Sequence, residues 1–137
     1  MCRIFLLLLL VVSLPLTGLA EEGLVFIGNG ALPKADLSAL QRLYTGRAVS
    51  LGEQQAIPVN FPAGHPVRER FLATVMGQNE EQYTGYWLVR RYVGKGAPPK
   101  ELPDVDAMVA YVLATPGAVA YVPAAKVPTG SNVIFRR

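Results

Sequence analysis

The residues of this chain whose types and spacing suit chemistry lie between Ile57 and Phe71. The segment reads Ile-Pro-Val-Asn-Phe-Pro-Ala-Gly-His-Pro-Val-Arg-Glu-Arg-Phe, which predicts a strand, a tight loop and the start of a helix. Backbone N–H groups at a helix N-terminus carry partial positive charge and hold phosphate or sulfate. If the chain binds a small anion, we therefore expect it at the start of this helix.

The candidate ligand-binding residues of this segment are Asn60, Gly64, His65, Val67 and Arg68. Asn60 ends the predicted strand, and Val67 and Arg68 offer backbone N–H groups at the helix start. The Arg68 side chain can reach back to an anion with a forked contact, and His65 is the one titratable group of the loop. The alternatives are a helix cap for His65 and a solvated surface position for Arg68.

Most catalytic and metal-site patterns are missing from the sequence. It contains one histidine, and its one cysteine, Cys2, lies at the extreme N-terminus. The acidic residues show no pairing suited to acid–base catalysis, and there is no nucleophile-elbow or phosphate-loop motif. We therefore expect no enzyme, no metal and no cofactor. Lysine and arginine are scattered rather than clustered, which argues against nucleic-acid binding.

Residues 1–20 have the layout of a secretory signal peptide. Arg3 precedes an apolar run from Ile4 to Val12, and the segment has the small-residue end Gly18-Leu19-Ala20. The run is shorter than the ~20 residues that span a bilayer, which weighs against the alternative of an uncleaved anchor. We expect cleavage after Ala20, leaving a domain of residues 21–137 without stable membrane insertion. Because that domain has no cysteine, the periplasm suits it better than an extracellular, disulfide-stapled role.

Apolar periodicity and capping residues predict alternating strands and helices. Strands are expected at 24–27, 57–61, 118–122 and 133–135, and helices at 36–45, 66–76, 79–94 and 104–115. Asp36, Asn79 and Asp104 are the expected N-caps. The stretches 47–55 and 95–103 are expected to be connections. This alternation predicts a single three-layer α/β domain, a small mixed sheet flanked by helices.

Some conspicuous residues are expected to have structural rather than functional roles. Asn29 lies between two glycines and is expected in a left-handed turn. Pro58 indicates that its strand starts at a sheet edge. A group of aromatic residues at helical spacing favours packing over a stacking platform for a sugar or nucleobase. They are Tyr83, Tyr86, Trp87 and Tyr92.

The order of these segments resembles the phosphate-type periplasmic substrate-binding proteins, which have the type II periplasmic binding fold. Leu37–Gly46 looks like the family's helix that ends in an aromatic residue, one further residue and glycine. Ile57–Phe71 occupies the place of its ligand loop and helix, and Tyr86–Gly94 that of a closing element. Pro116-Gly-Ala-Val-Ala-Tyr-Val122 resembles the family's Pro-Gly-Ala-Ile-Gly-Tyr-Val signature. The resemblance covers about 24–122. The family binds its ligand between two lobes, and the 117 residues from Glu21 to Arg137 are enough for one of them, so the resemblance implies a single lobe.

At the ligand loop this chain departs from the family pattern. The family typically has an arginine followed by Ser-Gly-Thr, whereas Phe61 and His65-Pro-Val67 stand here. Each lost neutral hydrogen bond removes ~1 kcal/mol and each charged one ~1.5–3 kcal/mol. The resemblance thus implies a periplasmic solute-binding-like module with weak or altered oxyanion binding, feeding a membrane transporter or sensor. The alternative is a partner-binding domain that has kept the fold and lost the ligand.

Overall fold

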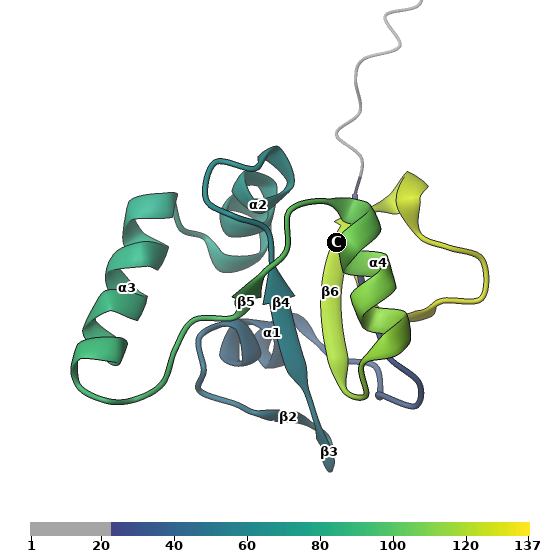
Figure 1. Cartoon of the computed structure of the whole chain (residues 1–137), viewed down its shortest axis with the longest axis horizontal. Helices are drawn as coiled ribbons and strands as arrows, with labels where there is room; N and C mark the ends of the chain where they lie inside the picture. Colours follow the sequence, from purple (N-terminus) through teal and green to yellow (C-terminus); the bar gives the residue numbers. More distant parts are fainter. Residues whose placement is uncertain (1–22) are drawn as a thin grey trace, which may run out of the picture.

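A mixed sheet of five strands lies at the centre of residues 23–137, the part of the chain that the computed structural model describes (Figure 1). Its strand order is β5-β4-β6-β1-β7. The β4 strand runs parallel to β5 and β6, whereas β1 runs antiparallel to β6 and β7. The strands are β1 (Leu24–Gly28), β4 (Ile57–Asn60), β5 (Lys100–Glu101), β6 (Ala118–Pro123) and β7 (Asn132–Arg136). The expected signal segment and its cleavage point lie outside the described residues.

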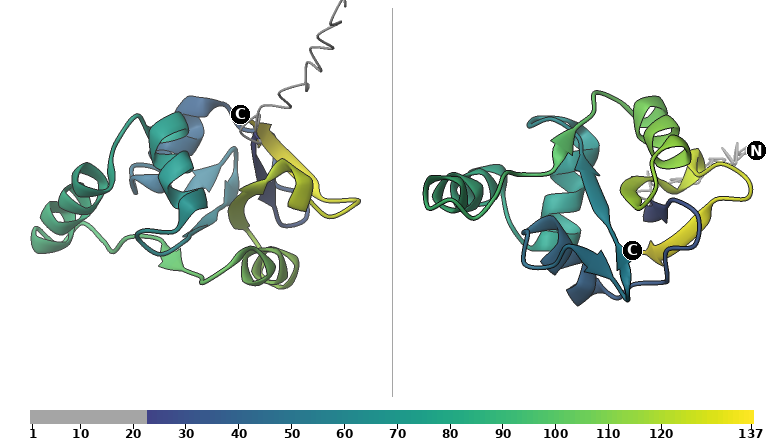
Figure 2. Two further views of the ribbon diagram at one scale, coloured as in Figure 1. Left: turned by 90° about the horizontal axis from the view of Figure 1, so that it is seen from above. Right: turned by 60° about the horizontal axis from the view of Figure 1, so that its bottom comes forward.

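Helices cover both faces of the sheet, which confirms the expected α/β class. Helix α4 packs on one face, α1 and α2 lie on the other, and α3 stands beyond the β5 edge (Figures 1 and 2). The helices are α1 (Leu37–Tyr44), α2 (Pro66–Phe71), the π-helical η1 (Leu72–Met76), α3 (Glu80–Tyr92), α4 (Val105–Ala114) and the 3-10 turn η2 (Ala124–Lys126). None of the helices in this part of the chain is long and apolar enough to cross a bilayer.

The N-caps predicted from the sequence are confirmed. The side chains of Asp36, Asn79 and Asp104 each accept a hydrogen bond from the backbone N–H three residues later. At α3, Gln82 also accepts from the Asn79 backbone N–H, which completes a capping box. These caps depend on residues close together in sequence, so the sequence is enough to locate them.

The two stretches expected as connections contain short strands. Residues 47–55 hold an antiparallel hairpin of β2 (Ser50–Leu51) and β3 (Gln54–Gln55). In 95–103, β5 pairs in parallel with Val59 and Asn60. Both of its residues are polar and exposed, so no apolar alternation marks them as a strand.

Of two expected local roles, one is confirmed and the other is wrong. β4 starts at a sheet edge as Pro58 predicts, because Ile57 and Pro58 pair with β6 alone and β5 begins only beside Val59. Asn29 does not take a left-handed conformation, and Gly30 supplies the positive φ of 57° instead. The Asn29 side-chain amide donates to the Val112 carbonyl at 2.7 Å, so this residue caps a carbonyl in the last turn of α4.

An aromatic cluster at the centre of the core joins α1 and α2 to the sheet. The rings of Phe71 and Tyr121 stack with centroids 4.3 Å apart, and Tyr44 lies 4.9 Å from Phe71. All three side chains are completely buried. The Tyr44 hydroxyl donates to the Val59 carbonyl at 2.9 Å, which ties α1 to the middle of β4. This packing fixes the end of β4 relative to α2, and so positions Asn60 and Arg68.

Candidate functional site

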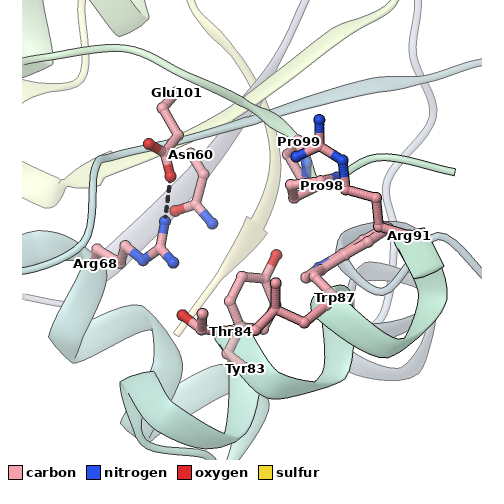
Figure 3. A pocket seen from close by; sticks show the side chains of 10 residues that line it. Asn60, Arg68, Tyr83, Thr84, Trp87, Arg91, Pro98, Pro99 and Glu101 are labelled. Carbon is pink, nitrogen blue, oxygen red and sulfur yellow. Dashed lines mark hydrogen bonds and ion pairs between the residues drawn. The ribbon is translucent and has the colours of Figure 1, made fainter.

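A crevice of about 140 Å³ opens at the carboxyl ends of the parallel strands β4 and β5 (Figure 3). Ligands of open α/β sheets bind at this end of the strands. One wall is the start of α2 and the end of β4, the opposite wall is α3, and the loop before β5 closes one side with Pro98 and Pro99. The crevice contains Asn60 and Arg68, which the sequence singled out, together with α3 side chains.

The Asn60 side chain directs an unpaired amide N–H₂ into the crevice. Its Oδ1 accepts a hydrogen bond from the Phe61 N–H at 2.9 Å and another from the Tyr121 hydroxyl. Because the Phe61 N–H can only donate, oxygen must occupy that position, and Nδ2 must point the other way. Nδ2 has no hydrogen-bond partner among the described residues, and Asn60 is only 1% exposed (Figure 3).

A second buried donor faces the same region from α3. Trp87 is largely buried, and its indole Nε1–H also forms no hydrogen bond of normal geometry with any described residue. The neighbouring Tyr83 hydroxyl donates to the Tyr44 carbonyl at 2.8 Å. Burial raises the pKa of Tyr83 to about 12, although the nearby Trp87 and Asn60 donors oppose that shift. Tyr83 therefore stays neutral. Its hydroxyl oxygen lies near both N–H donors but accepts a hydrogen bond of normal geometry from neither, so both can still pair with a ligand.

Arg68 is fully engaged within the protein. Its guanidinium binds both carboxylate oxygens of Glu80, at 3.0 Å from Nε and 2.5 Å from Nη2. Nη1 also donates to Glu101 and to the Phe61 carbonyl, each at 2.9 Å. Burial lowers the pKa of Arg68, but the hydrogen bonds and charge of Glu80 and the charge of Glu101 outweigh it, so the pKa is raised. One guanidinium thus faces two carboxylates, which leaves a net negative charge beside Asn60.

The remaining predicted residues lie at the start of α2 and do not line the crevice. His65 Nδ1 accepts a hydrogen bond from the Val67 N–H at 3.1 Å, and its ring stacks on Phe61 with centroids 4.2 Å apart. The backbone donor expected for an anion is therefore occupied by a helix cap, the alternative role for His65. Gly64 takes a positive φ of 87° in the turn before it. Ligand binding by Gly64, His65 and Val67 stays a prediction.

The α3 wall and the Arg68 partners are missing from the sequence prediction. Trp87 and Tyr83 do pack in the core as their spacing predicts, but their polar atoms also face the crevice. Glu80 and Glu101 lie 12 and 33 positions from Arg68, and nothing in the local sequence connects them. Glu80, Thr84 and Leu88 are four positions apart and therefore lie on one face of the predicted helix. This spacing is the one local signal that could have grouped these α3 residues.

Residues 23–137 contain no group of three or more histidine, cysteine, aspartate or glutamate side chains that could hold a metal ion. The crevice offers hydrogen bonding and charge. Its donors are Asn60, Trp87 and the exposed Arg91 on the rim, and its acceptors are the carboxylates around Arg68.

No protein-family model and no curated protein matches this chain. Among solved structures, it is similar to an ABC-type phosphate transport receptor from Vibrio cholerae, with a TM-score of 0.63 and 19% sequence identity. The match covers 82% of this chain but 45% of the receptor, so the chain spans less than half of the receptor's length. At this identity the likeness shows the fold alone. The chain has the fold of one lobe of a periplasmic binding protein.

Proposed function

We propose that this chain is a periplasmic solute-binding module whose crevice takes small solutes with hydrogen-bond acceptors and little negative charge. The observation that carries the proposal is the pairing of two buried, unpartnered N–H donors, on Asn60 and Trp87, with an Arg68 that Glu80 and Glu101 neutralise. Such a site recognises a carbonyl, a hydroxyl or a monocarboxylate. It differs from a phosphate site in having no unpaired buried cation among the described residues.

Free energy favours an acceptor in this position. A buried donor without a partner costs about 1–3 kcal/mol, so a ligand oxygen that pairs with both donors recovers that cost. A phosphate group in the same place would meet the excess carboxylate charge around Arg68 at short range. Its remaining attraction is to Arg91 on the rim, where solvent and salt weaken it. Oxyanion binding is therefore weak, and is altered in favour of monoanions and neutral solutes.

The comparison with a phosphate transport receptor supports an exported, solute-binding role for the same fold. We include in the proposal that residues 1–20 are cleaved after Ala20 and that the domain delivers its solute to a membrane transporter or sensor. Intact mass of the exported protein tests the cleavage, with an N-terminus at Glu21 as the expected result. Retention of Met1 on a membrane-bound species would contradict it.

A thermal-shift panel on the purified protein tests the ligand class. The panel compares phosphate, sulfate and molybdate with acetate, lactate, simple amides and monosaccharides. A solute at ~100 times its dissociation constant stabilises by ~2.7 kcal/mol, which is a clear shift in the midpoint. Trp87→Phe removes one donor and should reduce the shift, whereas Arg70→Ala, outside the crevice, should leave it unchanged. Stabilisation by phosphate alone, equal in the wild type and Trp87→Phe, would contradict the proposal.

A second candidate function is binding to a partner protein without a small ligand. It is favoured by the outer surface of α3, where large apolar side chains face solvent at Leu88, Val89, Tyr92 and Val93. A panel in which no solute shifts the midpoint would favour this candidate over the solute-binding module.

A further inference from the structure

A second cavity, of about 320 Å³, lies between α1, α3 and the segment that ends η1. It shares no lining residue with the crevice at the carboxyl ends of β4 and β5. Its volume is within the ~300–1,000 Å³ that small-molecule sites occupy. Arg42 and Arg47 line it, and no acidic side chain of residues 23–137 does. The cavity is therefore positively charged and distinct from the crevice.

The turn that ends α1 brings the two arginines to the same cavity. Gly46 takes a positive φ of 71°, and its N–H donates to the Leu43 carbonyl at 3.2 Å. The Arg47 N–H donates to the Arg42 carbonyl at 2.9 Å. These are the two hydrogen bonds of a Schellman motif, in which the chain folds back over the last turn of the helix. Arg47 therefore lies beside Arg42, although the two are five positions apart in the sequence.

Arg42 and Arg47 have no acceptor within the described part of the chain. Basic side chains at the end of a helix commonly bind its last carbonyls. At α1, three side chains of α3 already take these carbonyls: Tyr83 that of Tyr44 at 2.8 Å, Tyr86 that of Thr45 at 2.8 Å, and Arg90 that of Gly46 at 3.1 Å. Both arginines are exposed, and the ion pairs of the described residues involve Arg68 instead. Their guanidinium N–H donors therefore remain for a ligand.

The Tyr86 ring positions one of the two guanidinium groups. Arg47 lies over this ring at 5.5 Å from the centroid, and Arg90 lies over the same ring at 5.6 Å. Stacking uses the face of a guanidinium group, so the N–H donors at its edge stay free to contact an anion. Because two cations beside one ring repel each other, an anion in the adjoining cavity lowers the electrostatic energy.

A buried amide group adds to the polar lining of the cavity. Gln78 lines it, and its Oε1 is buried without a hydrogen-bond partner among the described residues. A buried polar atom without a partner costs free energy, which a ligand recovers by pairing with it. Since no hydrogen bond to a described residue fixes this amide, it can also turn its N–H₂ group toward an anion.

We propose that this cavity binds small organic dianions, such as dicarboxylates and phosphate monoesters, between Arg42 and Arg47. A guanidinium group contacts carboxylate or phosphate oxygens two at a time, and two free cations balance two negative charges. Gln78 supplies a further polar contact. The proposed ligands of the crevice are neutral or singly charged, so the two sites differ in the charge that they accept.

Isothermal titration calorimetry with succinate at low ionic strength tests this site. The wild type should bind succinate, and added NaCl should weaken binding because both arginines are exposed. Arg42→Gln and Arg47→Gln should each raise the dissociation constant about tenfold or more, since each removes a charged hydrogen bond. Arg91→Gln at the crevice rim and Arg136→Gln at the end of β7 are matched controls. Both are exposed arginines outside this cavity and should leave the constant unchanged.

The arginine variants also provide the outcomes that would overturn the proposal. These are an absence of saturable succinate binding by the wild type, an equal loss in all the arginine variants, or a loss in Arg91→Gln alone. The last result would place the dianion in the crevice. Solutes that stabilise the wild type, Arg42→Gln and Arg47→Gln equally belong to the crevice, so each proposal can fail without the other.

A substitution at Gln78 tests the site without removing a cation. Gln78→Glu keeps the size of the side chain and places a negative charge in the cavity, so it should weaken succinate binding at least about tenfold. Gln55→Glu is the matched control, because Gln55 is exposed on the β2–β3 hairpin and should have no effect. Equal dissociation constants for the two glutamate variants would overturn the placement of the dianion beside Gln78.

Discussion

The Arg68 guanidinium is held by the Glu80 carboxylate in a two-point ion pair across the start of α2 and the first turn of α3. Arg68 is 5% exposed, and Glu101 from β5 and the Phe61 carbonyl take its remaining directed contacts. One side chain therefore links three elements that are distant in sequence. The same side chain is the one expected from the sequence to bind an anion. Its contacts assign it to holding the crevice walls together.

Replacing Arg68 should destabilise the fold. Arg68→Ala leaves the half-buried Glu80 and the buried Phe61 carbonyl without their donor, and breaking a buried ion pair costs about 3 kcal/mol. The Glu101 contact adds little, because that side chain is 51% exposed. Urea denaturation measures the loss. Arg70→Ala is the control and should change the free energy of unfolding by less than about 0.5 kcal/mol. A variant as stable as the wild type that loses anion binding would instead support the ligand role.

Buried tyrosines should make the protein sensitive to alkali. Burial raises the pKa of Tyr83 to about 12 and raises the pKa values of Tyr44 and Tyr121 well above their usual range. All three are neutral in both states below pH ~10, so their effect on stability begins only above it. Between pH ~10 and ~12 the unfolded chain loses protons that the folded protein keeps. Stability should therefore fall by up to about 4 kcal/mol per pH unit, since each group contributes about 1.4.

Tyrosinate absorbance during a pH titration checks this prediction. The buried Tyr44, Tyr83 and Tyr121 should ionise together with unfolding. Ionisation of these three tyrosines that is complete while the protein is still folded would contradict the prediction.

Two glycines that both have a positive φ angle should differ in how well they tolerate replacement by alanine. Gly117 has φ +78°, and a Cβ there would lie 2.5 Å from the Gln55 carbonyl oxygen; Gly64 has φ +87° and nothing within 4 Å. Gly64→Ala should lower the free energy of unfolding by about 1 kcal/mol, which is the cost of placing alanine in a left-handed backbone conformation. Gly117→Ala must also displace the chain between β3 and β4, so we expect a loss of about 3 kcal/mol. Chemical denaturation of the two variants measures the difference in their free energies of unfolding. Equal losses would contradict the close approach of Gly117 to the Gln55 carbonyl.

His65 should contribute to stability as a helix cap. Its Nδ1 accepts from the Val67 N–H, and its ring stacks on Phe61. His65→Ala should cost about 1–2 kcal/mol, because the cap and the ring contact are both lost. His65→Asn keeps a side-chain acceptor at the cap and should recover about 1 kcal/mol. Thermal or urea unfolding of the two variants measures the difference. If the two variants are equally destabilised, the capping hydrogen bond contributes nothing.

Much of the fold could be predicted because its signals are local. The apolar runs at β1, β6 and β7 and the caps at Asp36, Asn79 and Asp104 depend on residues a few positions apart. Backbone capping and apolar periodicity act within one element, so the sequence states them directly. Only elements without such periodicity, such as β5, escaped prediction.

The sequence alone determined the order of the longer strands and helices, the α/β class and the presence of Asn60 and Arg68 near the end of β4. Tertiary structure decided what those side chains do. The Asn60 amide is turned toward the crevice by Phe61 and by Tyr121 of β6, and the charge of Arg68 is cancelled by Glu80 and Glu101. Hydrogen bonds and ion pairs act over a few ångströms in space, between residues that folding brings together from separate elements.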